Sequence, residues 1–254
     1  MTRHVLILGG TEEAYALAEA LAGRGGLRVV TSLAGRTASP RRPAGDFRVG
    51  GFGGPGGMAA WLRAEDVAAL VDATHPFAEA ISAEARAAAG LAGVPLLRLE
   101  RPAWEAGPGD DWREAADPGE ALALLDGLGA RRVLAVIGRR EVGALAGAPG
   151  IAFLLRSVEP PEALPPNVRW VQGRGPFAVA GEAALLQAER INALFCRASG
   201  GAGGRAKLDA ARDLGLPVVM LRRPAAGMAP SVGTVDAALA WLARAGSSGT
   251  MPRR

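Results

Sequence analysis

The sequence is poor in the residues that build disulfides and metal sites. Its 254 residues include one cysteine, Cys196, so an internal disulfide is excluded. The two histidines, His4 and His75, do not combine with this cysteine in a spacing typical of a zinc site, and we expect no bound metal. Aromatic residues make up 5% of the chain, and like charges form no long run. This composition argues against a nucleic acid partner.

Long hydrophobic runs are absent as well. No apolar stretch approaches the roughly 18 residues that a membrane-spanning helix needs. The first residues, 1–4, lead into an apolar strand without the pattern of a signal peptide. We therefore expect a cytoplasmic protein with no membrane partner. Hydrophobic residues still make up 49% of the chain, which is enough to bury the core of one large or two modest domains.

A glycine turn follows the first apolar run, residues 5–8, and leads into a sequence with helical spacing. Glycines let backbone amides approach a pyrophosphate, and a helix N-terminus supplies partial positive charge. The full G-x-G-x-x-G pattern is missing, so an ordinary strand-to-helix turn is the alternative. We take Gly9, Gly10, Thr11 and Glu12 as candidate cofactor-binding residues.

The second predicted strand, residues 27–31, is followed by Ser32 and Arg36. NAD sites place an acidic residue near this point, roughly 20 residues after the glycine turn, where it binds the ribose 2′-hydroxyl. Serine and arginine can instead hydrogen-bond a 2′-phosphate, so the sequence favours NADPH over NADH. The alternative is that Arg36 is an ordinary solvated side chain.

Four glycines surround one aromatic residue in the segment 50–54. Ordering a glycine costs backbone entropy, and a ligand that approaches the backbone closely would explain the pattern. A flexible loop is the alternative. Gly51, Phe52, Gly53 and Gly54 are therefore candidate cofactor contacts.

A histidine follows the short apolar run 68–71, which we predict to be a buried strand. In an open parallel sheet, ligands collect where strands end and helices begin. Thr74, His75 and Pro76 lie at such a point and are candidate cofactor contacts. The alternative is that His75 only caps the helix that follows.

The chain contains a faint internal repeat. Residues 69–102 and 193–224 both read as strand, loop, helix and a strand that ends in Arg-Pro. We predict an α/β fold of two Rossmann-like parallel-sheet halves with a ligand cleft between them. The expected domains are 1–100, which binds NADPH, and 101–246, whose last helix can pack back on the first domain. Residues 247–254 are expected to form a disordered tail.

The second half has its own candidate ligand loops. Arg174 and Gly175 lie in a glycine-proline turn before a predicted helix, which favours anion binding. Another glycine-rich loop begins Ser199-Gly200-Gly201 and precedes Lys207, the one lysine among 29 basic residues. A compact ammonium group and dispersed arginines suit a small polyanion. A surface lysine without function is the alternative.

Taken together, these motifs resemble the precorrin-6A reductase family, NADPH-dependent enzymes of cobalamin biosynthesis. The resemblance spans almost the whole chain. It is carried by residues 8–11, 32, 35, 51–54, 72–78, 101–104, 173–177, 199–201, 207 and 223–224. The Asp72–Ala78 and 173–177 motifs are specific, whereas the glycine turn is not.

The resemblance implies hydride transfer from NADPH to a tetrapyrrole, which saturates one double bond of the macrocycle. Arg140, Arg174, Lys207 and Arg223 are then candidate partners of the substrate carboxylates, and channelling contacts with neighbouring pathway enzymes are a partner class to consider. His75 is the candidate catalytic proton donor, with solvent or substrate carboxyl groups as alternatives. A cobalt-containing macrocycle and a non-enzymatic NADP(H)-sensing protein remain alternative functions.

Overall fold

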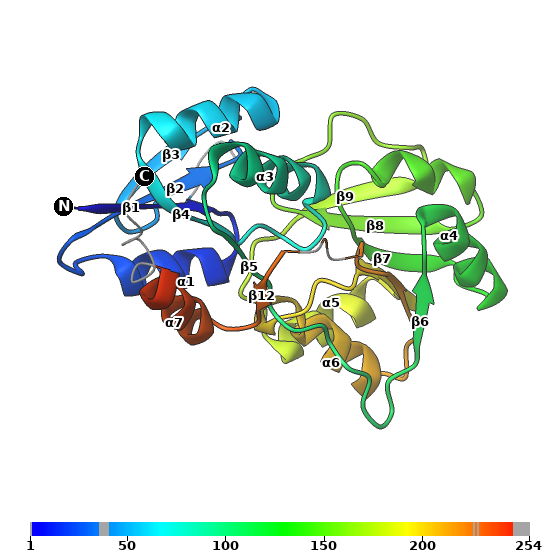
Figure 1. Cartoon of the computed structure of the whole chain (residues 1–254). Coiled ribbons are helices and arrows are strands. Elements are labelled where there is room, and N and C mark those ends of the chain that lie inside the picture. Colours follow the sequence, from blue (N-terminus) through cyan, green and yellow to red (C-terminus); the bar gives the residue numbers. More distant parts are fainter. Residues whose placement is uncertain (1, 36–40, 226, 228, 246–254) are drawn as a thin grey trace. The chain divides into compact units, whose positions relative to one another are not determined.

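The chain forms two α/β units, each with its own six-stranded parallel sheet (Figure 1). The computed structural model describes residues 2–35, 41–225, 227 and 229–245. Arg36 and the expected tail, residues 247–254, lie outside the described residues. The predicted class, an α/β protein with two Rossmann-like parallel sheets, is confirmed.

Unit 1 contains the chain up to Pro102 and again from Pro224. Its sheet has the order β12-β5-β4-β1-β2-β3. The strands are β1 (Arg3–Leu8), β2 (Leu27–Leu33), β3 (Asp46–Val49), β4 (Val67–Asp72), β5 (Leu96–Leu99) and β12 (Ser231–Val232). The helices are α1 (Glu12–Leu21), α2 (Gly54–Ala64), α3 (Glu79–Ala92) and α7 (Val235–Ala245). Strands β2 and β3 lie on one side of β1, and β4 and β5 lie on the other side. The direction in which successive strands are added to the sheet therefore reverses between β1 and β4.

Helices cover both faces of this sheet. Side chains alternate along β1, so Val5 and Ile7 pack with α1 and α7, while Leu6 and Leu8 pack with α2 and α3. Burial on both faces explains why the central strands read as continuous apolar runs instead of alternating patterns.

Unit 2, Ala103–Arg223, repeats this strand progression. Its sheet has the order β6-β11-β10-β7-β8-β9, with the reversal between β7 and β10. The strands are β6 (Trp112–Ala115), β7 (Arg132–Val136), β8 (Ala152–Ser157), β9 (Val168–Gln172), β10 (Ala193–Arg197) and β11 (Val218–Leu221). The helices are α4 (Pro118–Gly127), α5 (Val179–Ala188) and α6 (Ala206–Asp213), with short 3-10 turns η1 (Val142–Gly147) and η2 (Ala202–Gly204).

The last part of the described chain returns to unit 1. Of this part, the expected domains of 1–100 and 101–246 place only the last helix against the first domain. Strand β12 pairs with β5, and α7 packs against α1. Ala238 and Leu242 share a buried core with Leu17 of α1. The apolar face of α7 would be exposed without this contact, so the segment from Pro224 onward belongs with the first sheet.

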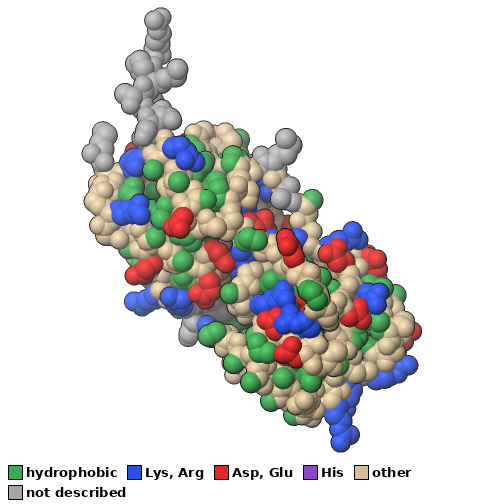
Figure 2. Space-filling view, turned by 90° about the horizontal axis from the view of Figure 1, so that it is seen from below, with side chains coloured by type: hydrophobic (Ala, Val, Ile, Leu, Met, Phe, Trp, Pro, Cys, Tyr) green, Lys and Arg blue, Asp and Glu red, His purple; other side chains and the backbone are tan. Residues whose placement is uncertain are grey.

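None of the helices in the described part of the chain combines the length and the apolar sequence that a membrane crossing requires. On the face shown in Figure 2, basic and acidic side chains lie interspersed among one another. This matches the scattered positions of the charged residues in the sequence.

Candidate active site

The point in unit 1 where the strand order reverses brings together two predicted loops, which follow β1 and β4. We call this place the switch point of unit 1. Thr11 caps α1, because its side-chain oxygen accepts a hydrogen bond from the Ala14 amide at 3.2 Å. Gly9 packs closely on β2, where a Cβ atom would lie 2.7 Å from the Thr31 methyl carbon. Gly10 has a φ of +110°, a conformation that favours glycine. The turn therefore places the N-terminus of α1 at the switch point, as an anion site requires.

The loop after β4 is ordered by a buried polar network. Asp72 accepts hydrogen bonds from the Thr74 amide at 3.1 Å and from its hydroxyl at 2.7 Å. The other carboxylate oxygen of Asp72 lies 2.7 Å from Nη1 of Arg98 on β5. Arg98 also donates to Thr74 Oγ1 at 3.0 Å and to Ser82 Oγ at 3.1 Å. The Thr74 hydroxyl is thus held inside the protein, which indicates that it orders the loop.

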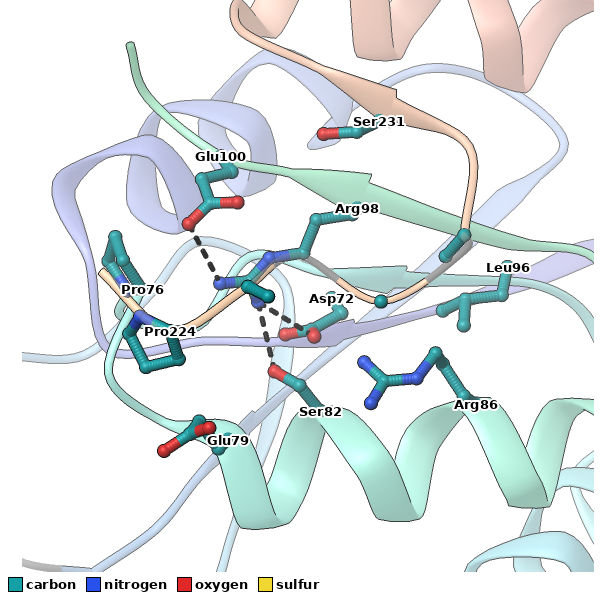
Figure 3. Close-up of a pocket in the computed structure, with 13 residues that line it drawn as sticks. Asp72, Pro76, Glu79, Ser82, Arg86, Leu96, Arg98, Glu100, Pro224 and Ser231 are labelled. Atoms are coloured by element: carbon teal, nitrogen blue, oxygen red, sulfur yellow. Dashed lines mark hydrogen bonds and ion pairs between the residues drawn. The ribbon is translucent and has the colours of Figure 1, made fainter. Parts of the chain in front are cut away.

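Figure 3 shows Asp72, Arg98 and Ser82 of this network at the side of a pocket within unit 1. Arg98 reaches toward Asp72, Ser82 and Glu100, and the guanidinium of Arg86 on α3 lies near the same space. The side chains that line the pocket carry both signs of charge. The pocket was not foreseen from the sequence, because its lining comes from β4, α3, β5 and the distant segment after Pro224.

His75 is half-buried at the start of this loop. Its Nδ1 atom accepts a hydrogen bond from the Phe77 amide at 3.2 Å, and the two rings lie 5.8 Å apart between centroids. An acceptor at Nδ1 places the hydrogen of the neutral ring on Nε2. Pro76 follows His75 and is buried.

Ser32 and Phe52 are linked by a residue that sequence reasoning missed, Arg48 on β3. Arg48 Nη1 donates to Ser32 Oγ at 2.8 Å, and its guanidinium carbon lies 3.8 Å from the centre of the Phe52 ring. Arg48 also donates to the carbonyl oxygens of Gly50 at 3.0 Å and Gly51 at 2.8 Å. Burial lowers the pKa of Arg48. The structure therefore joins the predicted serine and the predicted glycine loop through one cation.

Gly53 and Gly54, the other members of this predicted loop, both have positive φ. Gly53 precedes α2, and Gly54 is its first residue. Glu12 begins α1 with a side chain that is 78% exposed and lies 3.2 Å from Arg41. As an acid in the first turn it stabilises the helix dipole. Its side chain would repel a phosphate, so only its backbone suits an anion.

Two of the predicted substrate-binding arginines in unit 2 are exposed. Arg140 follows β7, and Arg174 follows β9. Neither makes a hydrogen bond or an ion pair with the residues that the structure describes. Both guanidinium groups are therefore available to an anion, and both lie after the carboxyl ends of strands of one sheet. Gly175 is exposed beside Arg174.

Lys207 is buried, in contrast to these arginines. Its ammonium nitrogen donates to the Gly204 carbonyl at 2.6 Å and lies 4.8 Å from the centre of the Trp104 ring. The Trp104 indole in turn donates to the Gly201 carbonyl at 2.7 Å. The Lys207 side chain therefore stabilises the predicted loop by binding a backbone carbonyl group. The rarity of lysine in the sequence did not indicate this role.

Arg223 supports the start of the same loop. Its Nε and Nη2 atoms each donate at 2.8 Å, to the carbonyls of Ala198 and Ser199. Gly200 is buried and adopts a positive φ of 65°. The predicted residues Ser199, Gly200 and Gly201 thus form one loop that Arg223 and Lys207 hold from two sides.

The equivalent switch point of unit 2 is filled by a side chain. Arg197, at the end of β10, lies over Gly138 and makes bonds of 2.6 and 2.5 Å with both carboxylate oxygens of Glu141. A Cβ atom at Gly138 would lie 1.9 Å from Arg197 Nη2. A Cβ atom at Gly10 of unit 1 would meet no described atom within 4 Å, so this turn leaves open a space of the kind that the guanidinium fills in unit 2.

A parallel sheet that reverses its strand order beside a glycine turn and a helix N-terminus defines the Rossmann-like class of α/β proteins. The chain belongs to the precorrin-6x reductase family CbiJ/CobK, whose model matches residues 4–243. It is therefore an oxidoreductase, and the predicted family is confirmed.

Individual relatives match over all or nearly all of their length. The precorrin-6A reductase of Rhodococcus erythropolis is 50% identical over 258 residues and 100% of both chains. The precorrin-6A reductase of Rhodobacter capsulatus is 44% identical over 250 residues, which cover 98% of each chain. A solved structure of CobK precorrin-6A reductase has a TM-score of 0.90 at 43% identity, and covers 100% of this chain and 99% of that chain.

Proposed function

We propose that this chain reduces a carbon–carbon double bond of precorrin-6A with NADPH, giving the dihydro product precorrin-6B. The observation that carries the proposal is the 50% identity to a named precorrin-6A reductase over 100% of both chains. The open switch point of unit 1 supports it, because a hydride donor of dinucleotide type needs such a site.

NADPH is the proposed cofactor, and it supplies the hydride when bound. Gly9, Gly10 and Thr11 are proposed to hold the pyrophosphate through their backbone at the N-terminus of α1. Ser32 lies at the carboxyl end of β2, where an NAD site has an acidic residue. Hydroxyl and guanidinium groups there suit a 2′-phosphate, which a carboxylate would repel.

Two further loops complete the proposed cofactor site. The backbone of residues 51–54 and of Glu12 would contact the dinucleotide, and His75 with Pro76 would lie against the nicotinamide. The Nδ1 contact with the Phe77 amide supports a positioning role for His75. Thr74 would act indirectly, because Asp72 and Arg98 hold its hydroxyl.

Unit 2 is proposed to bind the macrocycle through its carboxylates. The exposed guanidinium groups of Arg140 and Arg174 suit this role, because arginine forms paired hydrogen bonds with a carboxylate. Arg223 and Lys207 would act by holding the loop of Ser199 to Gly201. A macrocycle without metal is favoured, because both relatives compared above are named for precorrin-6A.

The test is reduction of defined macrocycles by the purified chain. NADPH oxidation is followed by absorbance with precorrin-6A, with cobalt-precorrin-6A and with no macrocycle, and the product is identified by mass spectrometry. We expect oxidation and a dihydro product with precorrin-6A. If NADPH is oxidised with cobalt-precorrin-6A but not with precorrin-6A, the cobalt-containing macrocycle is the substrate. NADPH binding without oxidation in either reaction would support the sensing function and contradict the proposal.

A further inference from the structure

We propose that Arg48 selects NADPH over NADH by binding the 2′-phosphate together with the Ser32 hydroxyl. The inference rests on the proposed function, since it assumes that unit 1 holds a nicotinamide dinucleotide. It adds a specificity-determining residue that lies outside every motif found in the sequence.

The position of Arg48 is the first argument. Ser32 and Arg48 are paired in register on the neighbouring strands β2 and β3, one residue before each strand ends. In sheets of this kind the ribose 2′ group is bound at the carboxyl end of the second strand. The 2.8 Å bond from Arg48 Nη1 to Ser32 Oγ brings the guanidinium to that end.

The charge of Arg48 is the second argument. Its three hydrogen bonds go to a hydroxyl and two carbonyl oxygens, which are all neutral acceptors. No carboxylate among the described residues forms an ion pair with it. A guanidinium has more N–H donors than these bonds use, so donors remain for a further acceptor. A half-buried cation without a counter-ion gains from a phosphate more than a solvated arginine does.

An arginine of unit 2 that also lies over a phenylalanine ring, Arg156 on β8, provides a comparison. Arg156 lies 4.0 Å from the centre of the Phe177 ring, much as Arg48 lies over Phe52, and the two rings follow β9 and β3, which are edge strands of their sheets. Arg156, however, makes two hydrogen bonds of 2.7 and 3.0 Å with the buried carboxylate of Glu182. In unit 2 the charge of Arg156 is thus neutralised by Glu182, whereas in unit 1 no described carboxylate neutralises the charge of Arg48.

The test compares ligands that differ in the 2′-phosphate. Calorimetry measures dissociation constants of NADPH, NADH, adenosine 2′,5′-bisphosphate and 5′-AMP for the wild type and for Arg48→Gln. We expect Arg48→Gln to lose about tenfold or more in affinity for the two ligands with a 2′-phosphate, as for a lost charged hydrogen bond. The affinity for NADH and 5′-AMP should change by less than about twofold.

The matched control is Arg28→Gln. Arg28 lies near the opposite end of β2, is 51% exposed, and pairs with Asp46 and Glu65 at 3.0 Å each. This variant should bind all four ligands as the wild type does. If Arg48→Gln fails to fold, Arg48→Lys is measured instead. A lysine retains the charge, but its single ammonium group cannot bind the carbonyl oxygens of Gly50 and Gly51 and a phosphate at the same time. We expect it to lose NADPH affinity selectively.

The outcomes separate the two proposals. Equal weakening of NADPH and NADH would mean that Arg48 only holds the glycine loop, and it would overturn the inference. A variant that keeps the wild-type preference for NADPH would also overturn it, while leaving the proposed cofactor in place. A wild-type protein that does not bind NADPH would overturn the proposed function itself and the inference with it.

Discussion

The hydroxyl of Thr11 donates a 2.7 Å hydrogen bond to the carbonyl oxygen of Ala73. The hydroxyl oxygen of Thr11 also accepts a hydrogen bond from the Ala14 amide, so one buried side chain both caps α1 and joins the loops after β1 and β4. The Ala73 amide in turn donates to Leu8 at 3.0 Å. The width of the proposed pyrophosphate site therefore depends on Thr11.

We predict that Thr11→Val lowers the free energy of unfolding by about 2 kcal/mol, because it removes a helix cap and leaves a buried carbonyl without its donor. The affinity for NADPH and NADH should fall by the same factor, since both contain the pyrophosphate. Urea denaturation and calorimetry measure the two effects. Thr11→Ser keeps the hydroxyl and is the control. Unchanged cofactor affinity in Thr11→Val would show that the joined loops do not bind the dinucleotide.

His75→Asn is expected to keep most of the wild-type turnover. An asparagine oxygen can accept the Phe77 amide hydrogen bond that Nδ1 accepts now, but an amide cannot protonate a carbon at neutral pH. His75→Ala should lose more activity, because it offers no acceptor. The measurement is kcat at saturating NADPH and macrocycle. A rate for His75→Asn below about one hundredth of wild type, the loss typical of a missing general acid, would identify His75 as the proton donor.

Arg174→Gln and Arg140→Gln are expected to raise the KM for the macrocycle by about tenfold each, as for a lost charged hydrogen bond, without changing the dissociation constant of NADPH. Arg113→Gln is the matched control, because Arg113 is an exposed arginine of unit 2 that already pairs with Asp111 at 2.9 Å. Steady-state kinetics and calorimetry separate the two quantities. A comparable loss of NADPH affinity would show that these loops bind the cofactor.

The thiol of Cys196 is expected to make stability depend on pH. Burial raises the pKa of Cys196, partly offset by the nearby Lys207 charge. Above about pH 8.5 the unfolded chain loses the thiol proton while the folded chain keeps it, so the free energy of unfolding should fall as the pH rises. Denaturation of the wild type and of Cys196→Ala between neutral and alkaline pH measures this. Parallel curves for the two proteins would contradict the assignment.

The sequence predicted those parts of the fold whose signals are local. The strands β1 and β4 are continuous apolar runs, and each is followed by a loop with a recognisable motif. The ends of these strands could therefore be predicted, and His75 could be predicted to follow β4. Strand β3, with the pattern DFRV, is short and exposed over most of its length, and it was not foreseen. Arg48 was missed for that reason, since its importance comes from its register opposite Ser32.

Side-chain orientation could not be read from the motifs either. The Thr74 hydroxyl belongs to a conspicuous motif, but its direction is decided by Arg98, which lies on another strand 24 residues away. Lys207 stands out by its rarity, yet its burial depends on packing against Trp104. Long-range contacts of this kind leave no local pattern in the sequence.

Transfer of a labelled hydride tests the central claim most directly. NADPH that carries deuterium at its hydride-donating carbon is incubated with precorrin-6A and the purified chain, and the product is examined by mass spectrometry. Two stereoisomers of labelled NADPH are tested, because an enzyme transfers only one of the two hydrogens at this carbon. The account predicts that the dihydro product carries deuterium with one of the two stereoisomers. A reduced product that contains no deuterium with either stereoisomer would contradict direct transfer from a dinucleotide bound to unit 1.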